Sequence, residues 1–279
     1  MNMRINRGQK MGRIEKKFRD LYNQKRKAFI AYITAGDPSL EATVNLVKEF
    51  DKQGVDIIEL GVPFSDPVAD GHVNQEASMR ALKNNVSVGD ILGAIREIRK
   101  NSGIPIIFFA YFNTILAYGL ERFVHDASDS GLDGALVLDL PPEEAEEYKK
   151  LMDSRNLATI FLVSPITPAE RLNIIAEYAT GFMYYVSQMG VTGERDSIAG
   201  GISENIREIK AQTDVPVVVG FGISSPDHVR EVAQHADGVV VGSAIVKRIG
   251  ESGRTRGFER IIGHYVGTLT SALKGAENG

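Results

Sequence analysis

Residues 55–71 read Val55-Asp-Ile-Ile-Glu59-Leu-Gly-Val-Pro63-Phe-Ser-Asp66-Pro-Val-Ala-Asp70-Gly71. The apolar run at the start predicts a short buried strand that ends at Glu59. The prolines and glycines that follow exclude regular structure and indicate a stiff loop, with Asp70 at its far end. The stretch therefore predicts one strand–loop unit of an α/β fold, with a carboxyl group at each end of the loop.

Glu59 and Asp70 are the candidate catalytic residues. A glutamate at the end of an apolar strand is costly unless it is used, because a carboxylate is poorly tolerated away from water. Two carboxyl groups that face one cavity suit proton transfer to and from a substrate. The structural alternative is that Glu59 and Asp66 or Asp70 cap the next helix, which is reasonable for one aspartate and poor for Glu59.

The composition limits the class of protein. The chain has 279 residues and no cysteine, so it has no disulfide and no thiolate metal site. Its net charge of −4 argues against a surface that binds nucleic acid. No apolar run is long enough to span a bilayer, and the basic residues 1–10 lack the apolar core of a signal peptide. We expect a cytoplasmic protein whose first ten residues are flexible.

Strand and helix patterns alternate along the whole chain. Strands are predicted at 28–34, 55–59, 104–110, 134–138, 158–163, 181–186, 215–219 and 238–241. Helices are predicted near 75–83, 88–100, 117–129, 143–153, 168–178, 203–211, 226–234 and 255–273, and another near 40–52. The strands are apolar without polar alternation, as parallel strands covered by helices are. Pro141-Pro142 followed by glutamates indicates a helix start.

This alternation predicts a single (β/α)8 TIM barrel over residues 1–279. The length suits such a barrel, which typically has about 250 residues. A doubly wound open sheet is the alternative, but it would leave apolar edge strands exposed. Met11, Ile14, Phe18, Leu21 and Tyr22 share one face of an extra N-terminal helix, which we expect to close the bottom of the barrel.

Two glycine-rich segments follow the last two strands. Gly220-Phe221-Gly222-Ile-Ser224 and Gly242-Ser243-Ala-Ile-Val246 each lead into a helix pattern. Small residues let backbone N–H groups approach an anion, and loops after strands seven and eight often bind phosphate in such barrels. The pair predicts a phosphate site. Lys247 and Arg248 are expected on the following helix, without a necessary contact to the ligand.

The loop after strand six, Ser187–Gly201, is polar and rich in glycine. It is interpreted either as a mobile lid, with Thr192 or Gly193 reaching a phosphate, or as a solvated connection. Alternation requires Tyr184 or Tyr185 to point into the barrel, where it would pack in the core or offer a hydroxyl group to a pocket. The five histidines show no ligand spacing, so no metal site is expected.

Several motifs together resemble the tryptophan synthase alpha chain family. They are Tyr32-Ile-Thr-Ala-Gly-Asp-Pro38, the Glu59–Gly71 stretch, Asp139-Leu-Pro-Pro142, Gly190-Val-Thr-Gly193, Gly220–Ser224 and Gly242-Ser-Ala-Ile-Val-Lys247. The match runs from about Arg13 to Ile249, and the Glu59–Gly71 stretch is its most specific part.

The resemblance implies retro-aldol cleavage of indole-3-glycerol phosphate to indole and glyceraldehyde 3-phosphate, without a cofactor in this chain. By this resemblance Glu59 transfers protons and Asp70 stabilises the ring N–H. The expected substrate-binding residues are Tyr184 near the substrate, Gly193, Phe221, Gly222, Gly242 and Ser243 at the phosphate, and Tyr32, Leu136 and Phe221 around the indole ring.

The resemblance also implies a partner. The family works in an alpha2-beta2 tetramer with a beta subunit that carries pyridoxal phosphate and receives indole through a tunnel. Pro63, Asp66 and Asn113 match positions that face this partner, with turn chemistry as their alternative role. The chain departs from the usual pattern at Ala31, His72, Asn74 and Thr114, and Asn74 replaces an apolar residue near the indole pocket.

Other functions are weighed against this interpretation. A stand-alone lyase would use the same site and release free indole rapidly without a partner. A non-catalytic phosphate-binding or regulatory barrel would not need the Glu59/Asp70 pair. A sugar-phosphate isomerase would need a histidine or lysine base at a strand end, and none is evident.

Overall fold

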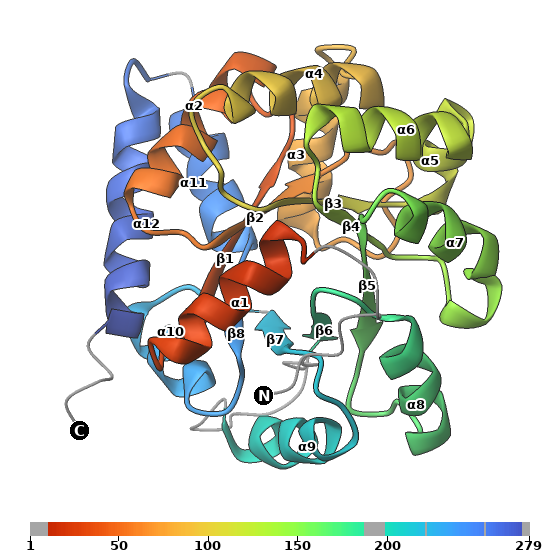
Figure 1. Ribbon diagram of the computed structural model, residues 1–279. Helices are drawn as coiled ribbons and strands as arrows, with labels where there is room; N and C mark the ends of the chain where they lie inside the picture. Colours follow the sequence, from red (N-terminus) through yellow and green to blue (C-terminus); the bar gives the residue numbers. More distant parts are fainter. Residues whose placement is uncertain (1–10, 187–198, 221, 254, 275–279) are drawn as a thin grey trace.

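Eight parallel strands close into a barrel in the computed structural model, which describes residues 11–186, 199–220, 222–253 and 255–274 (Figure 1). Each strand pairs with the next, and β8 returns to pair with β1. The predicted barrel is confirmed and the open sheet is wrong. The strands are β1 (Ala28–Thr34), β2 (Ile57–Gly61), β3 (Ile106–Ala110), β4 (Gly134–Val137), β5 (Ala158–Val163), β6 (Met183–Val186), β7 (Val217–Gly220) and β8 (Gly238–Val241).

Helices surround the barrel and cover the outward-facing side chains of the strands (Figure 1). Those between β1 and β4 are α2 (Leu40–Lys52), α3 (His72–Leu82), α4 (Val88–Arg99), α5 (Phe112–Tyr118) and α6 (Leu120–Ser130). Those that follow are the short 3-10 helix η1 (Pro142–Glu144), α7 (Glu146–Ser154), α8 (Ala169–Tyr178), α9 (Ala199–Gln212), α10 (Pro226–Ala233), α11 (Ser243–Ser252) and α12 (Phe258–Lys274). Ser39 caps α2, since its hydroxyl accepts a hydrogen bond from Ala42 N at 3.1 Å.

Several predicted element boundaries differ from the structure, most by two to four residues. The second strand lies at Ile57–Gly61 rather than 55–59, because Gly61 still pairs with Thr34 and Phe109 on its two neighbours. The helix predicted at 117–129 is two helices, separated at Gly119 by a backbone φ of 95° that a helix cannot adopt. The helix predicted at 255–273 is α12, and the separate helix α11, on which Lys247 and Arg248 were expected, starts directly after β8.

The helix α1 (Arg13–Asn23) lies across the barrel, as predicted (Figure 1). Its side chains Ile14, Phe18 and Leu21 belong to the same cluster as the inward-facing residues of the strands. Tyr22 does not share this face, because its side chain is 57% exposed. The helix therefore closes the barrel at the end where the strands begin, and the other end remains for a site.

The strands are fixed at this closed end by four matching pairs of hydrogen bonds. Each pair joins a residue that precedes an even-numbered strand to a residue at the start of the strand before it. The side chain of the first residue accepts a hydrogen bond from the backbone N–H of the second, at 2.8–3.0 Å. The same residue donates its own N–H back to that residue's carbonyl oxygen, at 2.8–2.9 Å. The pairs are Asp56 with Phe29, Asp133 with Ile106, Thr180 with Thr159, and Asp237 with Val217.

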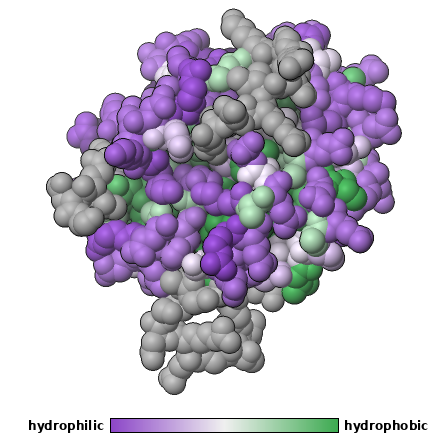
Figure 2. Space-filling view, turned by 60° about the horizontal axis from the view of Figure 1, so that its bottom comes forward, coloured by the Kyte–Doolittle hydropathy of each residue, from purple (hydrophilic) through white to green (hydrophobic). Residues whose placement is uncertain are grey.

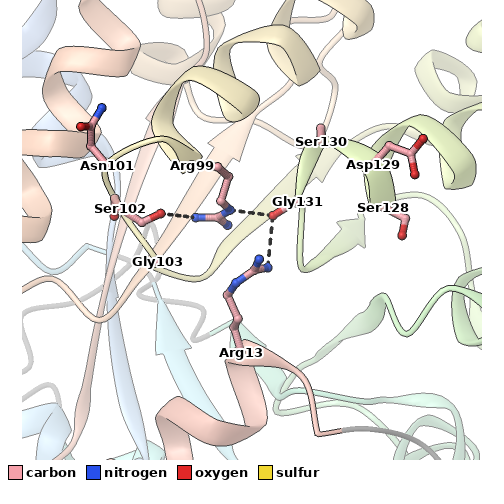
Figure 3. A pocket seen from close by; sticks show the side chains of 9 residues that line it. All are labelled: Arg13, Arg99, Asn101, Ser102, Gly103, Ser128, Asp129, Ser130 and Gly131. Carbon is pink, nitrogen blue, oxygen red and sulfur yellow. Dashed lines mark hydrogen bonds between the residues drawn. The ribbon is translucent and has the colours of Figure 1, made fainter.

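Asp133 has the most partners of the four side chains. Its carboxylate also accepts hydrogen bonds from Arg99 at 2.8 Å and from Arg13 of α1 at 2.7 Å. Figure 3 shows both arginines converging on the carbonyl group of Gly131, at the edge of a hollow of about 610 Å³. Arg99 also donates to Ile104 O at 2.6 Å, so its guanidinium group is held between α4 and the starts of β3 and β4. These contacts join α1 to the wall of the barrel.

Hydrophilic residues predominate on the face that Figure 2 displays, and hydrophobic residues lie there in small separate groups. No helix in the described part of the chain is long and apolar enough to cross a membrane.

We expect Asp133→Ala to lower the free energy of unfolding by about 3–5 kcal/mol, because it leaves the largely buried Arg99 without its counter-charge. Thr180→Val loses only a neutral hydrogen bond and should cost about 1 kcal/mol. Urea unfolding measures both. Asp129→Ala is the control, because that residue is exposed on α6 and its loss should stay within about 0.5 kcal/mol. Equal effects of all three changes would contradict the importance of these pairs.

Candidate active site

A cavity of about 430 Å³ lies at the ends of the strands opposite α1. This is the end where barrel enzymes carry their active sites. The cavity includes seven of the predicted site residues. Its lining consists of Tyr32, Glu59, Ala69, Asp70, Gly71, His72, Val73, Asn74, Phe109, Tyr184, Gly222, Ile223, Val240, Gly242 and Ser243.

Glu59 is the third residue of β2 and points into the barrel, with Tyr32 beside it on β1 and Ile107 beside it on β3. It is 0% exposed, and neither carboxyl oxygen has a hydrogen-bond partner among the described residues. Burial raises its pKa from the ordinary value of 4.5 to about 8. The side chain is therefore a protonated acid at neutral pH, and it can become a base once it has given up its proton.

Asp70 is half-buried at the end of the loop that follows β2. Its carboxylate accepts a hydrogen bond from the Tyr111 hydroxyl group at 3.1 Å. Burial raises the pKa of Asp70, while hydrogen bonds from Tyr111 and from the Asn74 side chain lower it again. The helix α3 begins after Gly71 without a side-chain cap, so neither Glu59 nor Asp70 has the capping role of the structural alternative.

Tyr111 is a residue that the sequence analysis missed. It follows β3, and its hydroxyl group accepts the N–H of Ala69 at 2.9 Å while it donates to Asp70. Its ring packs against Phe64 with the ring centroids 5.0 Å apart. Tyr111 thus fixes the loop at both ends. Its position directly after an apolar strand, where barrels carry functional groups, was the available signal.

Asn74 lies in the first turn of α3 and lines the cavity. Its Oδ1 atom is buried and has no hydrogen-bond partner among the described residues. A buried carbonyl group without a partner typically costs about 1–3 kcal/mol. The sequence departure at this position therefore introduces a polar atom into the cavity wall.

Two glycines at the ends of strands leave room for the tyrosines of the cavity. A side chain at Gly61 would overlap with the Tyr32 hydroxyl group, and one at Gly220 would overlap with that of Tyr184. Burial raises the pKa of both tyrosines, so their hydroxyl groups stay protonated at neutral pH. Tyr184 is the inward-facing member of its pair.

Tyr185 points outward instead, where its hydroxyl group accepts a hydrogen bond from Asn205 at 2.9 Å. Alternation along β6 thus assigns one tyrosine to the cavity and one to the helical layer.

The two glycine-rich segments meet at the cavity through Gly222, Gly242 and Ser243. Ser243 is the first residue of α11, so the N-terminus of this helix points its free N–H groups toward the cavity. Lys247 and Arg248 lie on α11, as expected. Arg248 stacks on the ring of Tyr265 at 3.6 Å and does not line the cavity.

The other predicted site residues are placed differently. Leu136 does not line the cavity, because β4 places it in the apolar layer below. Gly193, Phe221 and Thr192 lie outside the described residues. Of the positions predicted to face a partner, Asp66 and Asn113 are exposed, whereas Pro63 is buried and offers little surface.

The raised pKa of Glu59 predicts a pH-dependent difference in stability between the wild type and Glu59→Gln. The folded protein holds the proton up to about pH 8, and the unfolded chain releases it near 4.5. Stability from the neutral form is therefore present below pH 4.5 and is lost as the pH rises toward 8. Between about pH 6 and pH 7.5 the wild type should lose about 2 kcal/mol relative to Glu59→Gln, measured by urea unfolding. Equal slopes would show that Glu59 is already ionised in the folded state.

The chain is similar to known proteins both in sequence and in fold. The family model "Tryptophan synthase alpha chain" matches residues 18–266. The chain is 46% identical over 268 residues to the tryptophan synthase alpha chain of Geotalea daltonii, covering 95% of this chain and 98% of that one. It is 47% identical over 270 residues to that of Geobacter sulfurreducens, covering 95% and 99%.

Solved structures agree. Tryptophan synthase subunit alpha from Legionella pneumophila superposes with a TM-score of 0.89 at 37% identity, covering 95% of this chain and 99% of that one. A chain of the tryptophan synthase complex from Pyrococcus furiosus superposes with a TM-score of 0.81 at 38% identity, covering 88% and 99%. With matches in sequence and in fold along nearly its whole length, this chain belongs to the tryptophan synthase alpha chain family.

Proposed function

We propose that Glu59 and Asp70 carry out the alpha reaction of tryptophan synthase in this chain, with carbon–carbon lyase chemistry. The reaction is the retro-aldol cleavage of indole-3-glycerol phosphate to indole and glyceraldehyde 3-phosphate. The observation that carries the proposal is the buried carboxyl group of Glu59, which has no hydrogen-bond partner among the described residues and lies in the same cavity as Asp70.

The first step needs an acid. Because burial raises the pKa of Glu59 to about 8, its carboxyl group holds a proton at neutral pH and can deliver it to C3 of the indole ring. Protonation at C3 removes the aromatic character of the five-membered ring and leaves a positive charge on the ring nitrogen. Asp70 then stabilises this charge, since its carboxylate accepts a hydrogen bond from the ring N–H.

The second step needs a base. Glu59, now a carboxylate, removes the proton of the hydroxyl group on the carbon attached to C3. The O–H electrons form the aldehyde carbonyl group, the carbon–carbon bond breaks, and its electrons return to the ring and neutralise the nitrogen. Glu59 ends protonated, as it began, so one residue serves both steps and the reaction needs no cofactor.

The remaining lining residues bind the substrate in this proposal. Gly222, Gly242 and Ser243 leave room for the phosphate group at the N-terminus of α11. The resemblance to the family adds Gly193 and Phe221 to the proposed phosphate site. Tyr32 and Phe109 pack edge to face, with their centroids 5.1 Å apart, and form an apolar wall for the ring. Tyr184 contacts the substrate, and Leu136 supports the floor of the cavity.

We further propose that the chain acts in the cytoplasm with a beta subunit that carries pyridoxal phosphate, in an alpha2-beta2 tetramer. Asp66 and Asn113 are exposed at the end of the barrel that holds the cavity, which suits transfer of indole to such a partner. A stand-alone lyase with the same active site is the alternative.

Replacing Glu59 with Gln tests the catalytic role. The amide keeps the shape of the side chain but transfers no proton, so kcat for indole release should fall by about 10²–10⁴-fold. The matched control is Glu147→Gln on the surface of α7, which should keep the wild-type rate. Full activity of Glu59→Gln would refute the assignment.

Addition of a tryptophan synthase beta subunit distinguishes an alpha chain that depends on its partner from a stand-alone lyase. An alpha chain should release indole slowly by itself and at least about tenfold faster with the partner, since contact of the partner with Asp66 would reposition the loop that carries Asp70. Asp66→Lys should weaken this activation and leave the activity of the lone chain unchanged. A fast lone chain that ignores the partner would instead support the stand-alone lyase.

A further inference from the structure

Asn74 places a carboxamide group in the lining of the cavity that also includes Asp70. It lies in the first turn of α3, where its N–H donates to Gly71 O at 3.0 Å. Its side chain lines the same cavity as Asp70, and hydrogen bonding from this side chain lowers the pKa of the Asp70 carboxyl group. A carboxylate only accepts hydrogen bonds, so the NH2 end of the amide faces Asp70.

The carbonyl end of the amide is the unusual feature. Its Oδ1 atom is buried and has no hydrogen-bond partner among the described residues. The nearby donors serve other acceptors, since the Tyr111 hydroxyl donates to the Asp70 carboxylate and Gln75 Nε2 donates to the Asp70 carbonyl oxygen at 2.8 Å. A ligand that brings a hydrogen-bond donor into the cavity can therefore satisfy Oδ1.

We propose that Asn74 is a specificity-determining residue that accepts the N–H of the substrate's ring through Oδ1, beside Asp70. The inference rests on the proposed function, because that function brings a ring N–H to Asp70. One N–H shared by two acceptors is an ordinary three-centre hydrogen bond. A ring without this N–H leaves the buried Oδ1 atom of Asn74 without a donor and removes one donor from Asp70, so the site disfavours such a ring.

The two hydrogen-bond donors near the reacting carbon of the substrate, a hydroxyl group and the ring N–H, are directed to different residues, which supports this assignment. The hydroxyl group next to C3 is the proton source for Glu59, which approaches from β2 inside the barrel. Asn74 lines the cavity from α3, the helix that follows Asp70. The ring N–H is the donor that the proposed function directs to this side.

The test compares two inhibitors that differ in one ring atom. They are 3-(indol-3-yl)propyl phosphate, which has the N–H, and its benzofuran analogue, which has oxygen instead. Calorimetric titration gives the Kd of each, and the ratio of the two Kd values measures selectivity for the N–H. The variants are Asn74→Leu, which keeps the size and removes the amide, and Tyr111→Phe, which removes a donor from Asp70 but keeps the Asn74 carbonyl. Met79→Leu, at an exposed position of the same helix, controls for the fold.

We expect the selectivity ratio to fall about three- to tenfold in Asn74→Leu and to stay within about twofold of wild type in Tyr111→Phe and Met79→Leu. An unchanged ratio in Asn74→Leu would overturn the proposal. An equal fall in Tyr111→Phe would also overturn it, because the effect would then come from the orientation of Asp70.

Failure of the proposed function gives a different result. In that case the wild-type protein would bind neither phosphate compound, and no ratio would be obtained. If the wild type binds the indole compound and releases indole from the substrate while Asn74→Leu keeps its selectivity, only the role of Asn74 is refuted.

Discussion

The parallel pairing that joins β8 back to β1 is the constraint on which the rest of the molecule depends. Its register is held at one end by the four side-chain–backbone pairs, of which Asp133 with Ile106 is the most connected. Because side chains alternate along a strand, a shift of one residue would turn Glu59 out of the barrel. The charged network around Asp133 thus fixes, from the far end, which residues face the cavity.

The burial of Glu59, which follows from this register, lowers the stability of the folded protein. A carboxyl group that is 0% exposed and has no partner among the described residues opposes folding, and burial lifts its pKa to about 8. The same property makes it an acid at neutral pH. The barrel tolerates the cost because its stabilising contacts lie in the apolar layers and at the end that α1 closes, away from the cavity.

Sequence patterns predicted much of this arrangement. The barrel, the closing helix and the gathering of Glu59, Asp70 and the two glycine-rich segments follow from the alternation of strands and helices, since all loops after parallel strands meet at one end. The errors have local causes. Apolar periodicity cannot show that Gly61 is still paired, or that Gly119 interrupts a helix. Tyr111 and the burial of Pro63 depend on how one loop packs against another, which no sequence pattern contains.

By itself the sequence determined the fold class and the family, and it led to Glu59 and Asp70 as the candidate acids, because periodicity and motif spacing are properties of the chain alone. Only the tertiary structure decided what those acids are chemically. The raised pKa of Glu59 comes from desolvation by residues of several strands, and Asp70 is held by Tyr111, 41 positions away. The burial of the Asn74 carbonyl group, which has no partner in the described part of the chain, likewise arises only when α3 packs beside the cavity. The pKa shift and the hydrogen bonds depend on the burial of these groups and on the distances between them, and both are set only when the chain folds.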